Sequence, residues 1–192
     1  EDIAERMAHL EQIAMRLEVK EGKNGCVIIN DSYNSDLASL DIALDFMSRR
    51  SEDKGKKRTL ILSDMLETGQ SSKLLYRQVA ELVHSRGVEK IIGVGDEIRT
   101  ASSRFELEKY FFHSTEDLLK SDLLPNLRNE VVLIKGSRSF HFDDISERLE
   151  LKVHETILEI KLNALVDNLN YYSSKLKPET KMVCMVKASA YG

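Results

Sequence analysis

The sequence predicts an α/β fold, namely a Rossmann-like, mostly parallel sheet with helices on both faces. Short, almost continuously apolar runs recur between residues 26 and 135, and stretches with apolar residues at helical spacing separate them. Strands that are apolar on both faces are typical of parallel sheets that helices cover from both sides. Alternation of strand and helix is the pattern of βαβ units, which build such sheets.

The first half of this pattern covers residues 16–83. We expect an edge strand at 16–20, with a turn around Gly22 and Gly25 behind it. A buried strand at 26–30 and a helix over 36–47 come next, because the apolar residues of the helix fall largely on one face. A second buried strand at 59–63 and a helix over 72–83 then repeat the unit.

The second half continues the alternation as far as residue 149. A third strand is expected at 91–95, with a short helix from Glu97 towards Phe105. A brief strand at 110–112 precedes Ser114, which is placed to cap the next helix. The run at 131–135 is the last strand of the sheet, and residues 143–149 form the closing helix.

A second domain is expected after residue 152. From about His154 the pattern restarts with a strand, then a helix over 163–176, Pro178 as a break, and another strand. The sequence therefore predicts two domains, 1–152 and 153–192.

Composition narrows the possible functions. The formal net charge of −4 and the lack of a basic face argue against a nucleic-acid partner. No stretch approaches the roughly 20 apolar residues of a membrane helix, and the acidic start does not resemble a signal peptide. We expect Cys26 and Cys184 to be reduced, buried thiols of a cytoplasmic protein. The five histidines show no metal-ligand spacing, so no metal site is predicted.

Polar motifs follow the predicted strands, where parallel sheets bind their ligands. In chain order, Arg16-Leu17-Glu18 opens the edge strand, and four motifs at the ends of later strands come after it: Asp31-Ser32-Tyr33-Asn34, Asp64-Met65-Leu66-Glu67, Gly95-Asp96 and Lys135-Gly136-Ser137-Arg138. Together and in this order, over about residues 10–150, they resemble the C-terminal domain of the Mur ligases. The resemblance is to the branch that adds D-alanyl-D-alanine to UDP-N-acetylmuramoyl-tripeptide. Departures occur after Asn34, where Ser35-Asp36-Leu37 replaces Ala-Asn-Pro, and at Met15, Ser63 and Thr68.

The resemblance implies a role in ATP-dependent ligation for the first two motifs. Arg16 would reach the nucleotide, because a fixed cation stabilises the negative charge that spreads over a transferred phosphoryl group. Asp31, Tyr33 and Asn34 would lie where the nucleotide meets the incoming dipeptide. The structural alternatives are a surface salt bridge between Arg16 and Glu18, and capping of the following helix by Asp31 or Asn34.

The other motifs would bind the dipeptide. Lys135, Ser137 and Arg138 suit its carboxylate, and a solvated turn is their alternative. Asp64 and Glu67 would position its amine, although acidic residues are also common in strand-end loops.

A phosphate-binding loop is missing from the sequence. There is no Gly-x-x-x-x-Gly-Lys-Ser/Thr, so the resemblance implies that ATP and Mg²⁺ are bound mainly by a central domain upstream of residue 1. The expectation is a fragment of a longer enzyme, inactive by itself.

The end of the sequence resembles a different family. Lys187 follows an apolar run and begins Lys-Ala-Ser-Ala-Tyr-Gly, which is similar to the pyridoxal-phosphate lysine motif of alanine racemases. Residues 156–169 resemble the opening of the same family. The resemblance implies the start of a (β/α) barrel, with Lys187 as catalytic and cofactor-binding residue and Tyr191 at the cofactor phosphate. The parent would be a bifunctional cell-wall enzyme whose racemase half is homodimeric.

Two alternatives remain at this point. A free-standing Rossmann-like binding or receiver module fits the α/β pattern, but it leaves the Lys-Gly-Ser-Arg motif unexplained. A receiver would also cluster its acidic residues around one strand end, whereas Asp31, Asp64 and Asp96 follow three different strands. A pyridoxal-phosphate-binding regulator would account for Lys187 but not for residues 1–150.

Overall fold

The computed structural model describes residues 16–52, 55–65, 69–152 and 160–183. The chain divides into two compact units, Glu1–Lys152 and Val153–Gly192. Each unit is described by itself. Of the predicted site residues, Glu67, Lys187 and Tyr191 lie outside the described residues.

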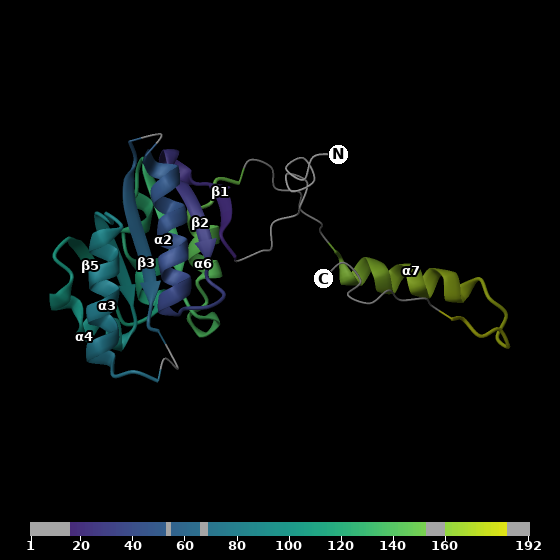
Figure 1. The fold of residues 1–192 in the computed structure, drawn as a ribbon. Coiled ribbons are helices and arrows are strands. Elements are labelled where there is room, and N and C mark those ends of the chain that lie inside the picture. The colour runs from purple at the N-terminus through teal and green to yellow at the C-terminus, as the bar shows by residue number, and fades with distance from the viewer. Residues whose placement is uncertain (1–15, 53–54, 66–68, 153–159, 184–192) are drawn as a thin grey trace, which may run out of the picture. The chain divides into compact units, whose positions relative to one another are not determined.

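The first unit is built on a six-stranded sheet with the order β1-β2-β6-β3-β4-β5. In Figure 1, β1 and β2 lie towards one edge of this sheet and β5 towards the other. The strand β1 pairs antiparallel with β2, and all the other pairs are parallel. The predicted mostly parallel α/β sheet is confirmed. The strands are β1 (Glu18–Glu21), β2 (Val27–Asp31), β3 (Lys57–Ser63), β4 (Lys90–Val94), β5 (Glu108–Phe112) and β6 (Glu130–Lys135).

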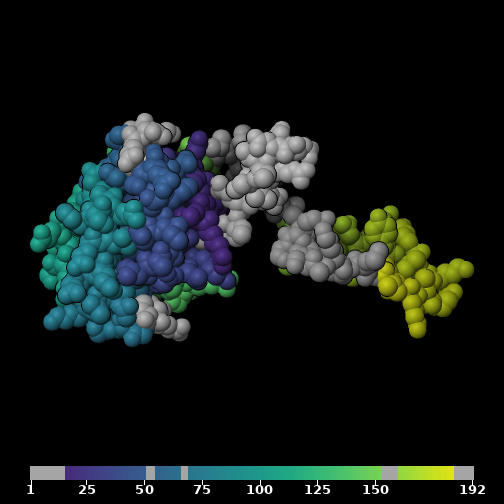
Figure 2. All heavy atoms as spheres, in the orientation of Figure 1, coloured from purple at the N-terminus to yellow at the C-terminus, as the bar shows by residue number. Residues whose placement is uncertain are grey.

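Helices cover both faces of this sheet. The described α-helices of the unit are α2 (Leu37–Glu52), α3 (Ser72–Ser85), α4 (Asp96–Thr100), α5 (Thr115–Lys120) and α6 (Asp143–Leu149). The unit also contains short 3-10 turns: η1 (Lys23–Gly25), η2 (Ser102–Arg104), η3 (Leu124–Asn126) and η4 (Arg138–Phe140). In the space-filling view, side chains of α2 and α3 form most of the face turned to the viewer (Figure 2).

Two hydrophobic cores result, one on each face, because successive strand residues point to opposite sides. In β2, Ile29 packs with the residues of α2 and α3, whereas its neighbour Ile28 packs with those of α5 and α6. In β6, Leu133 and Ile134 divide in the same way. Burial on both faces explains why these strands read as unbroken apolar runs.

Several predicted boundaries shift by a few residues. The first strand begins at Glu18 instead of residue 16, and Arg16 and Leu17 form a bend before it. The single short helix expected from Glu97 towards Phe105 is divided into α4 and η2. The turns η3 and η4 carry no periodic pattern, and the sequence did not predict them.

The end of the first unit returns to its beginning. After α6, the backbone N–H of Leu151 donates to the carbonyl of Glu21 at 2.8 Å, and Glu150 bridges Gly22 in antiparallel fashion. Lys20 Nζ lies 3.2 Å from a carboxylate oxygen of Glu150. These contacts tie the last residues of the unit to its edge strand.

The second unit contains one described helix, α7 (Leu162–Ser174). Every described residue of this unit is exposed, including the apolar residues of α7. The strand predicted after Pro178 does not include Met182 or Val183, and the rest of that run lies outside the described residues. No helix in the described parts of the chain is both long and apolar enough to span a bilayer.

Candidate functional site

A buried ion pair fixes the loop at which the candidate site begins. Asp31 and Lys135 are register partners at the carboxyl ends of the adjacent strands β2 and β6. Lys135 Nζ lies 2.8 Å from Asp31 Oδ2, and the lysine side chain is only 1% exposed. The same ammonium donates to the backbone carbonyl of Asn34. Lys135 therefore fixes the loop between Asp31 and Asn34 instead of presenting its charge to solvent.

Tyr33, inside this loop, contacts two arginines from opposite ends of the first unit. The guanidinium carbon of Arg16 lies 4.6 Å from the centroid of the Tyr33 ring, and that of Arg138 lies 5.0 Å from it. Both arginines are exposed. Cation–π contacts of this kind are favourable because the face of the ring is electron-rich.

A shallow pocket of about 210 Å³ opens beside these residues. It gathers five of the predicted site residues from three separate motifs, and Arg138 reaches the same place through the Tyr33 ring. The residues that line the pocket are Arg16, Leu17, Asp31, Tyr33, Asn34, Ser39, Ile42 and Lys135. Ser39 and Ile42 belong to the first turns of α2 and carry no motif, so the sequence did not mark them.

Asp36 caps α2 behind this loop. Its Oδ1 accepts from the backbone N–H of Ser39 at 2.9 Å, and its Oδ2 accepts from the Ser39 hydroxyl at 2.8 Å. The Ser39 amide is the main cause that lowers the pKa of Asp36, and the charge of Lys135 adds to the effect. The cap is therefore Asp36, and the alternative that Asp31 or Asn34 caps the helix is wrong.

Hydrogen bonds between buried polar groups also stabilise the loop between Asp31 and Asn34. The hydroxyl of Ser32, which is 1% exposed, donates to Asn30 Oδ1 at 2.7 Å. The same hydroxyl lies 3.3 Å from Asp143 Oδ1 at the start of α6. A local sequence pattern could not predict the contact between Ser32 and Asp143, because the two residues are far apart in the sequence.

The Lys-Gly-Ser-Arg loop is anchored to the neighbouring strand. The backbone N–H of Ser137 donates to the hydroxyl of Ser63, at the end of β3, at 3.0 Å. A Cβ on Gly136 would approach the ring of Phe142 to 2.6 Å, so glycine is required there. These two constraints fix the direction in which the chain leaves β6 towards Arg138.

Asp64 has a different environment from the predicted site residues around Tyr33. Its carboxylate accepts from the backbone N–H groups of Glu97 and Ile98, at 3.1 and 2.8 Å, and from the hydroxyl of Tyr76 at 3.1 Å. Burial, and next the charge of Asp64, raise the pKa of Tyr76. A Cβ on Gly95 would lie 2.3 Å from the Asp64 carboxylate. These contacts make Asp64 a structural link between β3 and α4, and they engage the oxygens that the prediction assigned to a dipeptide amine.

Asp96, at the next strand end, faces solvent. It lies 2.7 Å from His113 Nδ1 and 3.3 Å from a guanidinium nitrogen of Arg99. The hydrogen bond to His113 is the main cause that lowers the pKa of Asp96. Asp31, Asp64 and Asp96 thus have three separate sets of partners, and they do not form the acidic cluster of a receiver module.

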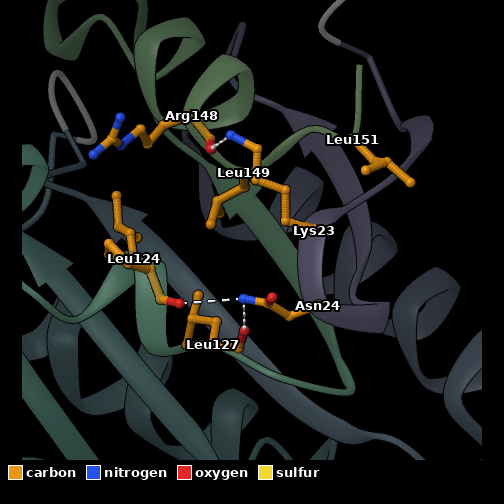
Figure 3. Close-up of a pocket in the computed structure, with 8 residues that line it drawn as sticks. Lys23, Asn24, Leu124, Leu127, Arg148, Leu149 and Leu151 are labelled. Atoms are coloured by element: carbon orange, nitrogen blue, oxygen red, sulfur yellow. Dashed lines mark hydrogen bonds between the residues drawn. The ribbon is translucent and has the colours of Figure 1, made fainter. Parts of the chain in front are cut away.

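A second, larger pocket of about 450 Å³ lies at the opposite, amino end of the strands (Figure 3). Lys23 Nζ donates to the carbonyl of Arg148 at 2.9 Å, and Asn24 Nδ2 donates to the carbonyls of Pro125 and Leu127 at 3.2 Å each. Leucine side chains form most of its remaining wall (Figure 3). None of the predicted motifs reaches this pocket. Among the described residues there is also no group of side chains suited to a metal ion.

Comparison with known proteins agrees with the motifs around Tyr33. The model of the family described as Mur ligase, glutamate ligase domain, matches residues 15–138. A UDP-N-acetylmuramoyl-tripeptide–D-alanyl-D-alanine ligase from Escherichia coli is 24% identical over 145 residues, which cover 75% of this chain and 31% of the relative. The ligase of the same name from Bacillus subtilis is 28% identical over 155 residues, covering 78% and 33%. The chain thus spans about a third of the length of these curated relatives.

Solved structures give the same fold. The MurF ligase from Thermotoga maritima in complex with ADP superimposes with a TM-score of 0.61 at 21% identity, covering 77% of this chain and 33% of that one. A MurF structure from Acinetobacter baumannii gives a TM-score of 0.58 at 18% identity, covering 72% and 31%. At these sequence identities the structural similarity establishes only the fold. The assignment to a family rests on the match of the sequence to the family model. The chain belongs to the Mur ligase family, and residues 15–138 match its C-terminal, glutamate ligase domain.

Proposed function

We propose that the first unit is the C-terminal domain of an ATP-dependent ligase that adds D-alanyl-D-alanine to UDP-N-acetylmuramoyl-tripeptide. The relatives that carry this name support the substrate pair. The observation that carries the proposal is the convergence of Arg16, Asp31, Tyr33, Asn34 and Lys135 on one pocket at the carboxyl edge of the sheet.

ATP, bound together with Mg²⁺ mainly by domains outside this chain, would supply the phosphoryl group that activates the acceptor carboxyl. The residues of this chain would surround the reacting groups. Arg16 contributes positive charge where negative charge develops, and a positioned cation of this kind lowers the energy of a phosphoryl-transfer transition state. Arg138, on the other side of the site, would bind the carboxylate of the dipeptide. The buried pair of Asp31 and Lys135 keeps the loop between them in place. The exposed Asn34 would hydrogen-bond a polar substrate. The half-buried Ser137 would do so with a hydroxyl that lies 2.9 Å from that of Ser139.

The test uses the longer protein that this proposal implies, with ADP release measured as a function of D-alanyl-D-alanine. Arg16→Ala should reduce turnover roughly ten- to a hundredfold, because hydrogen bonds to charged groups contribute about 1.5–3 kcal/mol. Arg77→Ala is a matched control, since Arg77 is an exposed arginine of α3 that pairs with Glu81 on the same helix. Equal effects of the two substitutions would contradict a role for Arg16 in the reaction, and ADP release that ignores the dipeptide would contradict the ligase assignment.

We propose further that the second unit is the opening of an alanine racemase barrel, fused to the ligase. Its supporting observation is the apolar row on α7, formed by Leu162, Leu165, Leu169 and Tyr172, all exposed. These residues recur at three- and four-residue spacing and so share one face of the helix. An apolar helix face of this kind needs a covering surface, which the rest of a barrel would supply. Pyridoxal phosphate would provide the electron sink for proton removal at the α-carbon of alanine, and Lys187 would hold it.

Borohydride reduction of the longer protein in the presence of pyridoxal phosphate tests the fusion. Peptide mapping should place the cofactor on Lys187, and Lys187→Ala should abolish racemisation while ADP release continues. Lys181→Ala, which changes an exposed lysine six positions earlier in the chain, should alter neither activity. Selective labelling of another lysine, or cofactor binding without racemisation, would contradict the racemase; the second result would favour a pyridoxal-phosphate-binding regulator.

The 192-residue chain by itself should bind the cofactor only weakly and reversibly. A solvated lysine is mostly protonated at neutral pH, because its ordinary pKa is about 10.4. Stoichiometric, selective labelling of Lys187 in this chain would contradict the expectation that further parts of a barrel are needed to complete the site.

A further inference from the structure

The Tyr33 ring joins two cations that the family resemblance assigns to different ligands. Arg16 belongs to the motif implied for ATP, and Arg138 belongs to the motif implied for the dipeptide carboxylate. Their guanidinium carbons lie 4.6 and 5.0 Å from the same ring centroid. Their separation is therefore at most 9.6 Å, the sum of the two distances.

The two arginines differ from the nearby lysine in how their charge is balanced. Lys135 is paired with Asp31 at 2.8 Å, and its charge also acts on Asp36. Within the described parts of the chain, no carboxylate lies within ion-pair distance of Arg16 or Arg138. Lys135 thus has its counter-ion inside the protein, whereas the arginines bring two exposed positive charges to one ring.

Both arginines are directed to the ring by rigid neighbours. Leu17, directly after Arg16, has a φ of 50°, a left-handed conformation that is rare for a bulky residue, and its side chain packs against the core of the α2 and α3 face. On the other side, the hydrogen bond from the Ser137 amide to Ser63 fixes the chain directly before Arg138. Backbone constraints on two separate segments therefore lead to the same contact.

We propose that Tyr33 is a positioning residue that holds Arg16 and Arg138 together as a single site for a phosphate-type oxyanion. This inference rests on the proposed ATP-dependent function, and it reassigns Arg138 from the dipeptide carboxylate to a phosphate group of the nucleotide. A guanidinium that lies over a ring can still donate its N–H groups to an anion. Two such groups suit an oxyanion with several oxygens and more than one negative charge.

The experiment follows the side-chain Nε–Hε resonances of Arg16 and Arg138 by NMR in the 192-residue chain. Inorganic pyrophosphate is the phosphate probe, and D-alanyl-D-alanine is the carboxylate probe. Pyrophosphate should shift both resonances with one common Kd, and the dipeptide should shift neither at comparable concentrations. Arg16→Lys and Arg138→Lys identify the two resonances, because each removes one of them.

Substitution of the ring tests its positioning role. Tyr33→Leu should raise the Kd for pyrophosphate by about four- to twenty-five-fold, because it removes two exposed cation–π contacts and each contributes a factor of about two to five. Tyr33→Phe retains the aromatic face and should bind like the unchanged protein. Tyr171→Leu is the matched control, since it removes a contact between Tyr171 and Lys175 at 5.1 Å in the second unit and should leave the Kd unchanged.

Several results would overturn the inference. They are different Kd values at the two arginines, no response of either resonance to pyrophosphate, a response of Arg138 to the dipeptide alone, and an unchanged Kd in Tyr33→Leu.

The outcome of this experiment is separable from that of the test of the proposed function. A common pyrophosphate response in a protein without dipeptide-dependent ADP release would refute the ligase and leave this site standing. Dipeptide-dependent ADP release with Arg138 responding only to D-alanyl-D-alanine would refute this site and leave the ligase standing.

Discussion

The sheet carries a buried lysine–carboxylate pair at each of its two ends, and the two pairs have different surroundings. At the amino end, Lys90 lies 2.7 Å from Glu130, and both side chains are less than a tenth exposed. At the carboxyl end, Lys135 lies 2.8 Å from Asp31, and this lysine is 1% exposed. The distances match, so the difference lies in what surrounds each pair.

At the amino end of the sheet, the groups of the ion pair find all their further partners within the protein. Glu130 also accepts from the hydroxyl of Thr59, and Lys90 has a second carboxylate, Glu108, at 3.6 Å. The carboxyl-end pair borders a pocket, and Arg16 and Arg138 add positive charge beside it. The charged groups at the amino end all have partners inside the protein, whereas an end with surplus cations is prepared to bind an anion.

The largest effect is expected at the amino end. Lys90→Met leaves Glu130 buried without its nearest cation, and removal of one partner from a buried pair costs about 3–5 kcal/mol. Urea denaturation followed by circular dichroism measures the loss. The double variant Lys90→Met with Glu130→Leu should recover most of it, since an apolar pair of similar size often replaces a buried ion pair without loss. A double variant as unstable as the single one would show that the ion pair itself is needed.

A smaller effect on stability is expected at the carboxyl end. Lys135→Met removes the partner of Asp31, but that carboxylate is 13% exposed and can recover part of its hydration. The free energy of unfolding should fall by about 1.5–3 kcal/mol, the contribution of hydrogen bonds to charged groups. Loss of the Asn34 contact should also weaken pyrophosphate binding, whereas Lys90→Met should not change it at temperatures where the protein stays folded. If Lys135→Met and Lys90→Met bound pyrophosphate equally well, the two ends of the sheet would not differ in function.

The smallest effect concerns the cap of α2. Asp36→Ala should reduce the free energy of unfolding by about 0.5–2 kcal/mol, as is usual for the loss of a side-chain cap. Because the folded-state pKa of Asp36 lies below its ordinary value of 3.8, its contribution is complete above that pH and is lost as the pH falls through the folded pKa. The difference between the variant and the unchanged protein should therefore shrink below about pH 4. A difference that stays constant between pH 6 and pH 3 would contradict capping by the charged form.

Much of the first unit could be predicted from local pattern. Ile28 and Ile29 are both buried, one on each face, and such a run predicts a central parallel strand. The order of the strands could not be predicted in the same way. Insertion of β6 between β2 and β3 depends on pairing between segments that are distant in the sequence, and it is what makes Asp31 and Lys135 neighbours.

The candidate site shows the same division. The motifs marked the residues of the site, including Tyr33. They did not show that Arg16 and Arg138 contact the same Tyr33 ring, because the two arginines meet it only after the two ends of the unit have folded together. The roles of Lys135 and Asp64 were also decided by burial. Both follow the pattern of a ligand-binding residue at a strand end, and both are engaged by protein groups.

What the sequence determined by itself is the alternation of strand and helix and the chemistry gathered at the strand ends, since both depend on residue type and local spacing. Asp64 and Asp96 show what it left open. Each is an aspartate within two residues of the end of an apolar strand, yet Asp64 is buried against the amide groups of α4, while Asp96 is 73% exposed beside His113. The direction of each carboxylate depends on which backbone N–H groups lie within reach. Only the packing of β3 against β4 and α4 decides that.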